Sequence, residues 1–447
     1  MNIKDEFDTI TAISTPLGTG GVGVIRISGD KSFDIALKMF DKKNLPIGKI
    51  CHGWIINDEK KIDEVIILPF KAPNSYTGED VIEIQCHGGI NVVKNILELT
   101  IKNGARMAQR GEFTKRAFLN KRIDLSQAEA VDDIIHSKTS EFARQSAKNL
   151  SGMLADKIRE IKKEIFEVAS KIVAGIDFPE DVAEPEYSYL NENFEKSINE
   201  IDKILAYAKS SDIMRQGLKV AIVGRPNVGK SSLFNALLNL NRAIVTEFAG
   251  TTRDIISETI DIGIPVTLID TAGIREDRNI DKVEEIGIEY SKQSLKDADL
   301  VLFLYDSSVG YNENDKLIYE NIKNKKYLII ANKNDIATNK AKIFDNELKI
   351  SANTKEGIES LKEEIKKIAL GYSAEDMEFT TNQRQQTCLI RCKESLENAL
   401  AASRNNELQD MIYIDLKSAL LALDEITGEV ITDDILNNIF DHFCIGK

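Results

Sequence analysis

A glycine-rich segment at residues 224–231 has the composition of a phosphate-binding loop. Its sequence, GRPNVGKS, fits the pattern of a glycine, four variable residues and then Gly-Lys-Ser or Gly-Lys-Thr. Glycines in such a loop let successive backbone N–H groups point at phosphate oxygens, and the following helix N-terminus favours negative charge. Lys230 would reach the β- and γ-phosphates, and the Ser231 hydroxyl would ligate Mg²⁺. The expected phosphate contacts come from Asn227, Val228, Gly229, Lys230, Ser231 and Ser232.

The residues on either side of this loop indicate the elements that hold it. The apolar run at 219–223 is typical of a buried strand, and the stretch from the loop to about Leu240 is typical of a helix. A strand, a glycine-rich turn and a helix in this order bring backbone N–H groups to the helix N-terminus. The flanking elements therefore strengthen the prediction of a nucleotide site, because the short pattern alone also occurs by chance.

Three short strings farther along the chain indicate that the nucleotide is GTP. DTAG at 270–273 follows an apolar strand, so its aspartate would face the magnesium side of the site. NKND at 332–335 follows another strand, and an aspartate there can accept from two guanine N–H groups that adenine does not offer together. SAN at 351–353 can present a backbone N–H to the guanine carbonyl. The residues expected to contact GTP here are Asp270, Thr271, Ala272, Gly273, Asn332, Lys333, Asp335, Ser351, Ala352 and Asn353.

The group that orients the attacking water is not evident from these strings. GTTRD at 250–254 lies where a switch threonine completes the magnesium shell. The residue after the DTAG glycine is a water-orienting glutamine in many small GTPases, but here it is Ile274, which cannot hold a water. Hydrolysis is therefore either very slow or supported by another group. Candidate acids lie at 275–277 and 283–285, unless these are ordinary surface charges.

Length and composition limit the classes of protein to which the chain can belong. With 447 residues, 42% of them hydrophobic and 29% charged, the chain suits a soluble protein of two or three domains. No apolar run approaches the ~18–20 residues of a membrane span, and the N-terminus is too polar for a secretory signal. Five scattered cysteines favour a reducing compartment, so we expect a cytoplasmic protein that does not use a membrane.

The balance of charge argues against an extended surface for nucleic acid. The net charge is −14, whereas neutralising phosphates requires clustered lysine and arginine. One local basic cluster lies within residues 106–122, and it is either a solvated face or a local RNA contact. Its members are Arg106, Arg110, Lys115, Arg116, Lys121 and Arg122. Any contact with RNA is therefore expected to be local or shared with a partner.

Changes in pattern along the chain suggest four segments. Short strands and turns give the first an α+β character. In the third, strands alternate with helices, which predicts a mostly parallel six-stranded sheet with helices on both faces and a hairpin near 263–265. Because helical patterns flank this third segment, we expect it to be inserted into one helical domain. The expected boundaries are 1–118, 119–213, 216–372 and 376–447.

The two helical segments carry apolar residues at helical spacing. In the first of them, we expect an apolar side formed by Phe166, Val168, Ile172 and Ile176. An acidic loop at 175–185, which contains proline, interrupts this pattern. The last helix is predicted near 433–443.

Together these strings resemble one family over essentially the whole chain. GRPNVGKSSL, GTTRD, DTAGIRE, VEEIGIE and the terminal FCIGK are similar to the tRNA-modification GTPase family MnmE, also called TrmE. The N-terminal strings GGVGVIRISG, NSYTGEDVIEIQCHGG and GEFTKRAFLNKRIDLSQAEAV resemble the same family. FCIGK is the most specific of these strings, because other phosphate-loop GTPases lack it.

The resemblance implies a multidomain α/β and α+β homodimer. An α+β folate-binding domain precedes a discontinuous helical domain, into which a Ras-like P-loop GTPase domain is inserted. The family acts with an FAD-dependent partner, GidA (MnmG), to place an aminomethyl-type group on C5 of the wobble uridine of certain tRNAs. The one-carbon unit comes from a tetrahydrofolate derivative in the 5-formyl or methylene form. Potassium stimulates GTP hydrolysis when two GTPase domains meet.

By position, the resemblance also implies roles for residues of the nucleotide site. The residues that match potassium ligands are Asn227, Thr246, Phe248 and Thr251, and those that match magnesium ligands are Ser231 and Thr252. Glu284 matches the catalytic glutamate that positions the water, which would compensate for Ile274. Two extra residues between DTAG and that glutamate leave Glu285 as an alternative.

A second set of matching residues belongs to the folate site. They are Arg26, Glu83, Arg122 and Lys447, although a lysine is more usual at position 122. Cys444 matches a near-terminal cysteine of the family and is either a functional thiol or a buried, inert one. His87 either tunes the folate pocket or is a structural histidine.

Two other functions remain open at this point. A GTPase that acts as a ribosome-assembly or checkpoint factor would explain the nucleotide strings without any small-molecule chemistry. Folate binding distinguishes such a factor from a tRNA modification enzyme. Alternatively, residues 1–118 serve purely for dimerisation, which light scattering of mixed truncated and full-length chains would test. The linkers at 212–217 and 371–373 are the expected hinges of the nucleotide segment.

Overall fold

The computed structural model describes residues 8–240, 257–270, 296–338, 342–371 and 377–447 of the chain. Two compact units can be distinguished in it, and each is built from segments that are far apart in the sequence. Unit 1 comprises residues 1–132, 150–185 and 407–447, and unit 2 comprises residues 133–149 and 186–406. Each unit therefore contains helical residues from both sides of the nucleotide segment.

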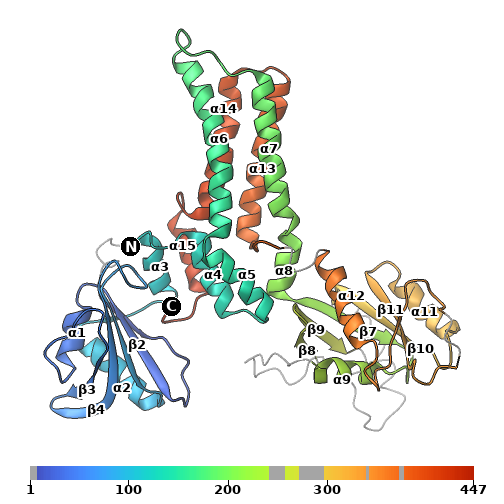
Figure 1. The fold of residues 1–447 in the computed structure, drawn as a ribbon, viewed down its shortest axis with the longest axis horizontal. Coiled ribbons are helices and arrows are strands. Elements are labelled where there is room, and N and C mark those ends of the chain that lie inside the picture. Colours follow the sequence, from blue (N-terminus) through green and yellow to red (C-terminus); the bar gives the residue numbers. More distant parts are fainter. Residues whose placement is uncertain (1–7, 241–256, 271–295, 339–341, 372–376) are drawn as a thin grey trace. The chain divides into compact units, whose positions relative to one another are not determined.

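A six-stranded sheet forms the first part of unit 1 (Figure 1). Its strand order is β3-β4-β5-β2-β1-β6, and neighbouring strands are antiparallel except for β1 and β6. The strands are β1 (Ile10–Ile13), β2 (Val22–Ser28), β3 (Cys51–Asn57), β4 (Lys60–Phe70), β5 (Val81–His87) and β6 (Arg106–Met107). Helix α1 (Ser32–Lys38) follows β2, and helix α2 (Ile90–Lys102) follows β5. This arrangement is the α+β pattern predicted for the N-terminal segment.

The two helices cover one face of this sheet. Ile25 of β2 and Ile84 of β5 are fully buried there, together with Ile35 of α1 and Ile96 of α2. Successive side chains of a strand point to opposite faces, so the residues between these isoleucines belong to the other face. The core of the sheet therefore lies on its helical side.

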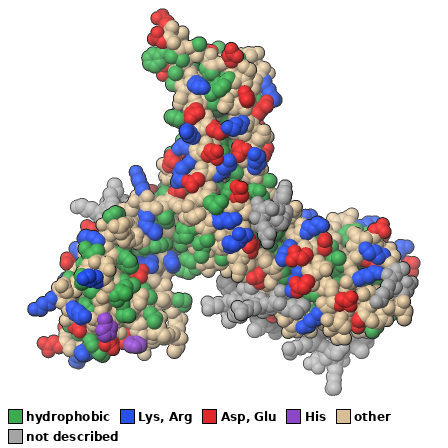
Figure 2. All heavy atoms as spheres, in the orientation of Figure 1, with side chains coloured by type: hydrophobic (Ala, Val, Ile, Leu, Met, Phe, Trp, Pro, Cys, Tyr) green, Lys and Arg blue, Asp and Glu red, His purple; other side chains and the backbone are tan. Residues whose placement is uncertain are grey.

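The opposite face of the sheet is only partly covered. It carries Arg26 on β2 and Glu83 on β5 at directly paired positions. Val22, Ile66 and Phe70 are exposed on strands of the same face. In Figure 2, hydrophobic side chains lie exposed over this part of unit 1, beside side chains coloured as histidine. This face thus combines an ion pair with uncovered apolar surface.

Five further helices belong wholly or mostly to unit 1. They are α3 (Glu112–Leu119), α4 (Leu125–Ile135), α6 (Met153–Asp177), α14 (Gln409–Thr427) and α15 (Asp433–Asp441). Helices α6 and α14 pack against each other, and Lys162 forms ion pairs of 2.5 Å with Asp424 and with Glu429. Leu125 of α4 and Phe440 of α15 share a second buried cluster.

The expected apolar side of α6 is partly wrong. Val168 and Ile172 are buried, but Phe166 is 58% exposed and Ile176 is 40% exposed. Residues that are two apart in a helical sequence differ by about 200° in direction, so Phe166 points away from the side that contains Val168. Buried residues at Ile158, Ile161 and Ile165 show that the packed side continues without Phe166.

Within the described residues, unit 2 contains four helices that lie outside residues 218–370 in the sequence. They are α5 (Ser140–Leu150), α7 (Tyr187–Ala206), α8 (Ala208–Gln216) and α13 (Gln383–Arg404). Helices α7 and α13 pack together, and the Lys393 ammonium lies 2.6 Å from an Asp202 carboxylate oxygen. Helix α13 begins with a reciprocal capping box between Asn382 and Gln385, which satisfies two backbone N–H groups of its first turn.

The nucleotide fold of unit 2 is a six-stranded sheet in the order β12-β11-β10-β7-β9-β8. All neighbours are parallel except β8 and β9, which form the hairpin expected near residues 263–265. The strands are β7 (Leu218–Gly224), β8 (Ser257–Asp261), β9 (Pro265–Asp270), β10 (Leu300–Asp306), β11 (Tyr327–Asn332) and β12 (Leu348–Lys349). The prediction of a mostly parallel six-stranded sheet is therefore confirmed for the described residues.

Helices cover both faces of this sheet (Figure 1). Helices α9 (Lys230–Leu240) and α12 (Ile358–Leu370) pack over one face, where Leu233 and Leu361 are fully buried. Helix α11 (Glu313–Ile322) covers the other face, where Ile322 is fully buried beside Phe303. Because five of the strands run parallel, their carboxyl ends lie at one edge of the sheet, where ligands bind in folds of this type.

The expected hinge at 212–217 is not an open linker. Residues up to Gln216 belong to helix α8, and Met214 is fully buried in the core of the nucleotide fold. The Ser210 hydroxyl donates a 2.7 Å hydrogen bond to the Leu370 carbonyl at the end of α12. Helix α8 is thus packed as part of the nucleotide fold. Of the other expected hinge, residues 372 and 373 lie outside the described residues.

Candidate functional site

The glycine-rich loop connects the end of β7 to the start of α9, at the carboxyl edge of the sheet. Gly229 has a φ of +99°, and a Cβ placed there would lie 2.2 Å from Nδ2 of Asn332. A Cβ on Gly224 would lie 2.3 Å from the Leu304 carbonyl oxygen. Both positions therefore accept only glycine, as a backbone that closes around phosphate oxygens requires.

Two residues of the NKND string hold the second half of the loop. Asn332 donates from Nδ2 to the Val228 carbonyl at 2.8 Å and accepts at Oδ1 from the Ala352 N–H at 3.0 Å. Lys333 donates from Nζ to the Asn227 carbonyl at 2.7 Å. The structure thus brings the loop, NKND and SAN together, although they are far apart in the sequence.

Lys333 is itself fixed by a carboxylate at the end of β10. Its Nζ lies 2.7 Å from Oδ2 of Asp306. Burial alone would raise the pKa of Asp306, but hydrogen bonds from Lys333 and Ser308 outweigh burial and hold that pKa below its usual range. Asp306 therefore stays ionised and keeps Lys333 directed at the loop.

Lys230 and the serines after it form the first turn of α9. The Lys230 ammonium donates to the Gly224 and Arg225 carbonyls at 2.9 Å each, so it lies across the loop. Ser231 and Ser232 are exposed at the helix N-terminus, where backbone N–H groups lack helical partners. This geometry suits an anion that binds at the helix end and draws Lys230 toward it.

The guanine end of the expected site is also assembled. Asp335 is exposed in the turn after β11, and the neighbouring Asn334 donates its backbone N–H to the Ile350 carbonyl at 3.0 Å. Ser351 is fully buried, and its hydroxyl accepts from the Thr354 N–H at 3.1 Å. The turn with Asp335 is thus fixed beside the string that begins at Ser351, and Asn353 is exposed in that string.

Several expected residues of the nucleotide site fall outside the described residues. They are Thr246, Phe248, Thr251, Thr252, Thr271, Ala272, Gly273, Ile274, Glu284 and Glu285. For Asp270, only its backbone position at the end of β9 is described. The potassium set, one magnesium ligand and the catalytic glutamate therefore stay predictions from the sequence.

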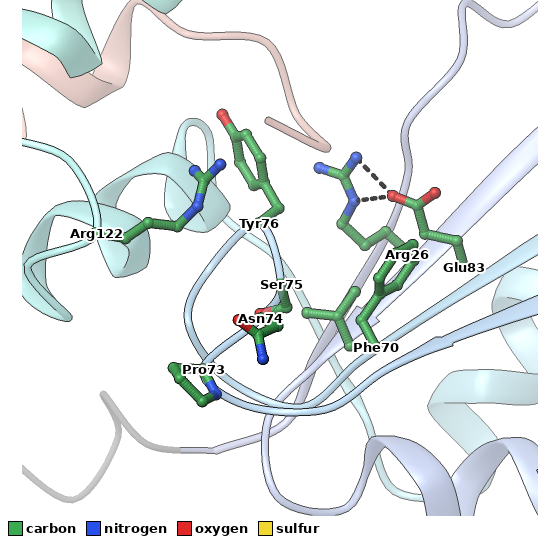
Figure 3. Close-up of a pocket in the computed structure, with 9 residues that line it drawn as sticks. Arg26, Phe70, Pro73, Asn74, Ser75, Tyr76, Glu83 and Arg122 are labelled. Carbon is green, nitrogen blue, oxygen red and sulfur yellow. Dashed lines mark hydrogen bonds and ion pairs between the residues drawn. The ribbon is translucent and has the colours of Figure 1, made fainter. Parts of the chain in front are cut away.

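A second cluster of functional side chains surrounds a cavity of about 510 Å³ in unit 1 (Figure 3). It lies on the open face of the N-terminal sheet and beneath the loop between β4 and β5. Its lining residues are Arg26, Phe70, Pro73, Asn74, Ser75, Tyr76, Val81, Glu83 and Arg122. The volume falls within the range of about 300–1,000 Å³ that is usual for small-molecule pockets.

Arg26 and Glu83 form the polar centre of this cavity. Nε and Nη2 of Arg26 lie 2.9 Å and 2.8 Å from the same oxygen, Oε1 of Glu83. The two side chains are only 11% and 19% exposed, so solvent screens the pair weakly. Because Arg26 uses only Oε1 of Glu83, the Oε2 atom is available to accept from a ligand.

Tyr76 lies between the cationic groups of the pocket. In Figure 3 the Tyr76 side chain lies between those of Arg26 and Arg122. Its ring centre is 4.9 Å from the Arg26 guanidinium carbon and 5.1 Å from that of Arg122. The Lys447 ammonium lies 5.9 Å from the same ring centre. Burial and the nearby Arg26 charge lower the pKa of Lys447. Three of the four folate residues expected from the sequence therefore lie around one aromatic ring, and the fourth, Glu83, is paired with Arg26.

The C-terminal tail reaches this pocket because it pairs with the start of unit 1. The Gly446 carbonyl accepts from the Ser14 hydroxyl at 3.2 Å and from Nη1 of Arg26 at 3.4 Å. A Cβ on Gly446 would lie 2.3 Å from the Ile13 carbonyl oxygen, and its φ is +95°. The glycine of FCIGK is thus needed for the close approach that positions Lys447.

Comparisons with known proteins cover nearly the whole chain. A family model of the MnmE helical domain matches residues 125–444, and one of the GTP-binding protein TrmE N-terminus matches residues 9–122. The tRNA modification GTPase MnmE of Thermoanaerobacter pseudethanolicus is 44% identical over 463 residues, which span 99% of this chain and 100% of that protein. The protein of the same name from Staphylococcus aureus is 41% identical over 460 residues, with the same coverage. This chain belongs to the MnmE family.

Family membership confirms the enzyme class expected from the sequence, a GTPase of a tRNA modification family. Among solved structures, the G domain of the T. maritima FeoB iron transporter is 28% identical and covers 35% of this chain and 99% of that one. Its TM-score of 0.26 is too low to support a conclusion about this fold. No helix within the described residues is long and apolar enough to cross a membrane.

The basic cluster at 106–122 is not one solvated face. Arg116 is buried and donates to both oxygens of Glu79 at 3.2 Å, while its Nη2 lies 3.0 Å from Oδ1 of Asp8 and from Oε1 of Glu112. Arg106 binds Asp8 and Glu112 as well, at 2.6 Å and 2.7 Å. Two of the six cations are therefore paired with carboxylates, and Arg116, whose side chain is 4% exposed, is not available to RNA.

The remaining candidates are less closely tied to the pocket. Cys444 is exposed, so the alternative of a buried, inert thiol does not apply. His87 is 70% exposed, and its Nδ1 lies 2.7 Å from Oδ1 of Asp63, outside the residues that line the cavity. Tyr76 was missed as a site residue, although it lies in the NSYTGED string that resembles the family. An aromatic residue in a polar, glycine-containing loop is the signal that indicates it.

Proposed function

We propose that this chain is a potassium-stimulated GTPase that takes part in modifying C5 of the wobble uridine of certain tRNAs. A tetrahydrofolate derivative, in the 5-formyl or methylene form, would supply the one-carbon unit. An FAD-dependent partner, GidA (MnmG), would share the reaction, as the family resemblance implies. The relatives named tRNA modification GTPase support the tRNA part of this proposal.

The pocket around Arg26 and Glu83 is the observation that carries the proposal. A pterin ring offers N–H donors that a carboxylate such as Glu83 can accept, and its flat face can stack on Tyr76. Glutamate carboxylates of a folate suit the cations Arg122 and Lys447. A ribosome factor without small-molecule chemistry would have no use for such a pocket. The residues present therefore fit a tetrahydrofolate derivative.

The glycine-rich loop supplies the nucleotide part of the proposal. The cradle formed by Gly224 and Gly229 would be filled by any larger residue, and it lies at a helix N-terminus, so it fits the phosphates of GTP. Lys230 would bind these phosphates, Ser231 and Thr252 would ligate Mg²⁺, and Asp335 would bind guanine. The expected potassium ligands are Asn227, Thr246, Phe248 and Thr251. Glu284 would orient the attacking water.

The open face of the N-terminal sheet supports the proposed homodimer. Val22, Ile66 and Phe70 expose apolar side chains on this face, although burying them would be favourable. A second copy of the chain could cover them, and the pocket would then lie beside the interface because Phe70 also lines it. Sedimentation of the full chain at several concentrations would test this association.

Binding of 5-formyltetrahydrofolate to the purified chain tests the folate part directly. Isothermal titration should give a saturable isotherm for the wild-type chain and a much weaker one for Arg122→Ala. Lys121→Ala is the matched control, because it removes a neighbouring exposed cation that does not line the pocket. Equal binding by the two variants, or no binding by the wild type, would refute the assignment of this pocket.

The potassium part requires a separate measurement. GTP hydrolysis should be faster in potassium than in sodium, and the difference should grow with protein concentration because two GTPase domains must meet. Glu284→Ala should abolish the potassium-dependent rate. A slow rate that is the same in both salts would contradict the mechanism.

A further inference from the structure

The first half of the phosphate loop has an anchor that the sequence strings do not indicate. Nε of Arg225 lies 2.6 Å from Oδ1 of Asp315, a fully buried carboxylate in the first turn of α11. Arg225 is the residue directly after the first glycine of the loop, and its side chain is 19% exposed. We propose that Arg225 and Asp315 are positioning residues that hold the loop in its nucleotide-binding conformation.

Asp315 is itself held rigidly, so it can act as an anchor. Its Oδ2 accepts from the Asn312 backbone N–H at 3.1 Å, and its own N–H donates to Oδ1 of Asn312 at 3.3 Å. These reciprocal bonds form a capping box at the start of α11. The helix N-terminus also favours the negative charge of Asp315. One carboxylate oxygen therefore closes the helix cap while the other fixes Arg225.

The anchor acts on the part of the loop that the NKND residues do not reach. Asn332 and Lys333 hold the carbonyls of Val228 and Asn227, which belong to the second half. The Arg225 carbonyl, in the first half, accepts from the Lys230 ammonium at 2.9 Å. Fixing the Arg225 side chain thus also fixes the Arg225 carbonyl, which binds the Lys230 ammonium until a phosphate takes its place.

The burial of this pair argues that it has a role beyond stability. Nη2 of Arg225 is buried without a hydrogen-bond partner among the described residues, which is unfavourable for a cation. A buried ion pair is weak evidence for stability, since apolar residues of similar volume often serve as well. A loop that is ordered before binding, in contrast, does not lose affinity to the cost of ordering.

Arg225→Gln and Asp315→Asn test this inference, which rests on the assignment of residues 224–231 as the GTP phosphate loop. The probe is GDP that carries a fluorescent N-methylanthraniloyl group, titrated into the full-length chain. Each variant should bind it about tenfold more weakly or worse, because each loses a hydrogen bond between charged groups. The double variant should lose no more GDP affinity than the single variant that binds GDP more weakly.

Two control variants separate positioning from stability. Asp133→Asn breaks another Arg–Asp pair of unit 2, in which Nε of Arg215 on α8 donates to Oδ1 of Asp133 on α4 at 2.9 Å. Glu313→Gln removes an exposed charge from the same turn of α11 as Asp315. Both should bind GDP as the wild type does, whatever their thermal midpoints. A lowered midpoint with unchanged GDP affinity in Arg225→Gln and Asp315→Asn would overturn the inference.

The kinetics of GTP hydrolysis give a second readout. In the two variants KM should rise more than kcat falls. Without the anchor, their loop is less ordered before binding, but bound GTP orders it again. If either variant does not fold, Arg225→Lys tests the same point, because it keeps the charge but loses the Nε donor and should also weaken GDP binding. A wild-type chain that binds no GDP would refute the proposed GTP site itself, whereas wild-type binding with unaffected variants refutes only the anchor.

Discussion

Arg26 and Glu83 occupy directly paired positions on β2 and β5, and two hydrogen bonds join their side chains at a single carboxylate oxygen. Because both residues point to the open face of the sheet, the pair forms the floor of the pocket rather than part of the core. The second oxygen of Glu83 can therefore accept from a ligand while the first holds Arg26 in place.

Glu83→Gln should weaken binding of 5-formyltetrahydrofolate by about tenfold or more, because the amide loses the charge that orders Arg26 and binds ligand N–H groups. Isothermal titration measures the effect. Glu64→Gln is the matched control, since Glu64 is a half-exposed acid on the same face that pairs with His52 at 3.1 Å. Equal affinities of the two variants would show that Glu83 does not contact the ligand.

Lys447 should make folate binding depend on pH. Burial and the Arg26 charge lower its pKa from the ordinary value of 10.5, so it loses its proton at a lower pH than an exposed lysine. An anionic ligand binds the protonated form, and affinity should therefore fall as pH rises through this lowered pKa. Titrations at increasing pH should show this fall in affinity in the wild type. In Lys447→Arg, the fall should appear only at a higher pH. A profile that Lys447→Met leaves unchanged would argue against this role.

Gly229→Ala should abolish tight nucleotide binding. The new Cβ would lie 2.2 Å from Nδ2 of Asn332, the atom that holds the Val228 carbonyl, and the φ of +99° is unfavourable for alanine. Gly104→Ala is the control for backbone strain alone, because Gly104 has a φ of +112° and open space around it. Fluorescent GDP should bind the control as it binds the wild type, although both variants lose about 1–3 kcal/mol of stability to backbone strain. Tight binding by Gly229→Ala would show that the cradle tolerates a side chain.

The order of strands and helices could be predicted because it depends on local patterns. Alternation with a period of two indicates the strands around Arg26 and Glu83, and strand–helix alternation indicates the parallel sheet of the nucleotide fold. The exposure of Phe166 could not be predicted from a list of apolar residues, because only its angular position relative to Val168 decides which side it faces.

The sites depended on contacts between distant segments. The meeting of Arg122 and Lys447 at Tyr76 requires the C-terminal tail to pair with the start of unit 1, and no local pattern predicts this. In the same way, the sequence gives no sign that Arg225 binds Asp315 or that Arg116 is buried. Ion pairs of this kind are made by tertiary packing, and their partners lie tens of residues away.

Arg116→Met should destabilise unit 1 by about 3 kcal/mol or more, because it removes the partner of Glu79 and leaves buried carboxylates less well compensated. Lys121→Met, which removes an exposed cation nearby, should change the free energy of unfolding by less than about 0.5 kcal/mol. Chemical denaturation of the full chain, followed at a probe in unit 1, measures the difference. Similar losses in both variants would mean that the network around Arg116 contributes nothing specific.

The same network should make unit 1 sensitive to acid. Hydrogen bonds from Arg106 lower the pKa of Asp8. Burial would raise the pKa of Glu112, but the hydrogen bonds from Arg106 and the Gln109 N–H, together with the nearby Arg116 charge, outweigh burial and lower it. A carboxyl whose pKa is lowered by folding binds fewer protons in the folded state than in the unfolded state. Its contribution to the free energy of unfolding is therefore complete above the ordinary pKa of about 4. It is lost as pH falls through the lowered values. In Arg116→Met, acid unfolding of unit 1 should therefore begin at a higher pH than in the wild type, because less stability remains to be lost. An unchanged acid midpoint would show that Asp8 and Glu112 are stabilised by Arg106 alone.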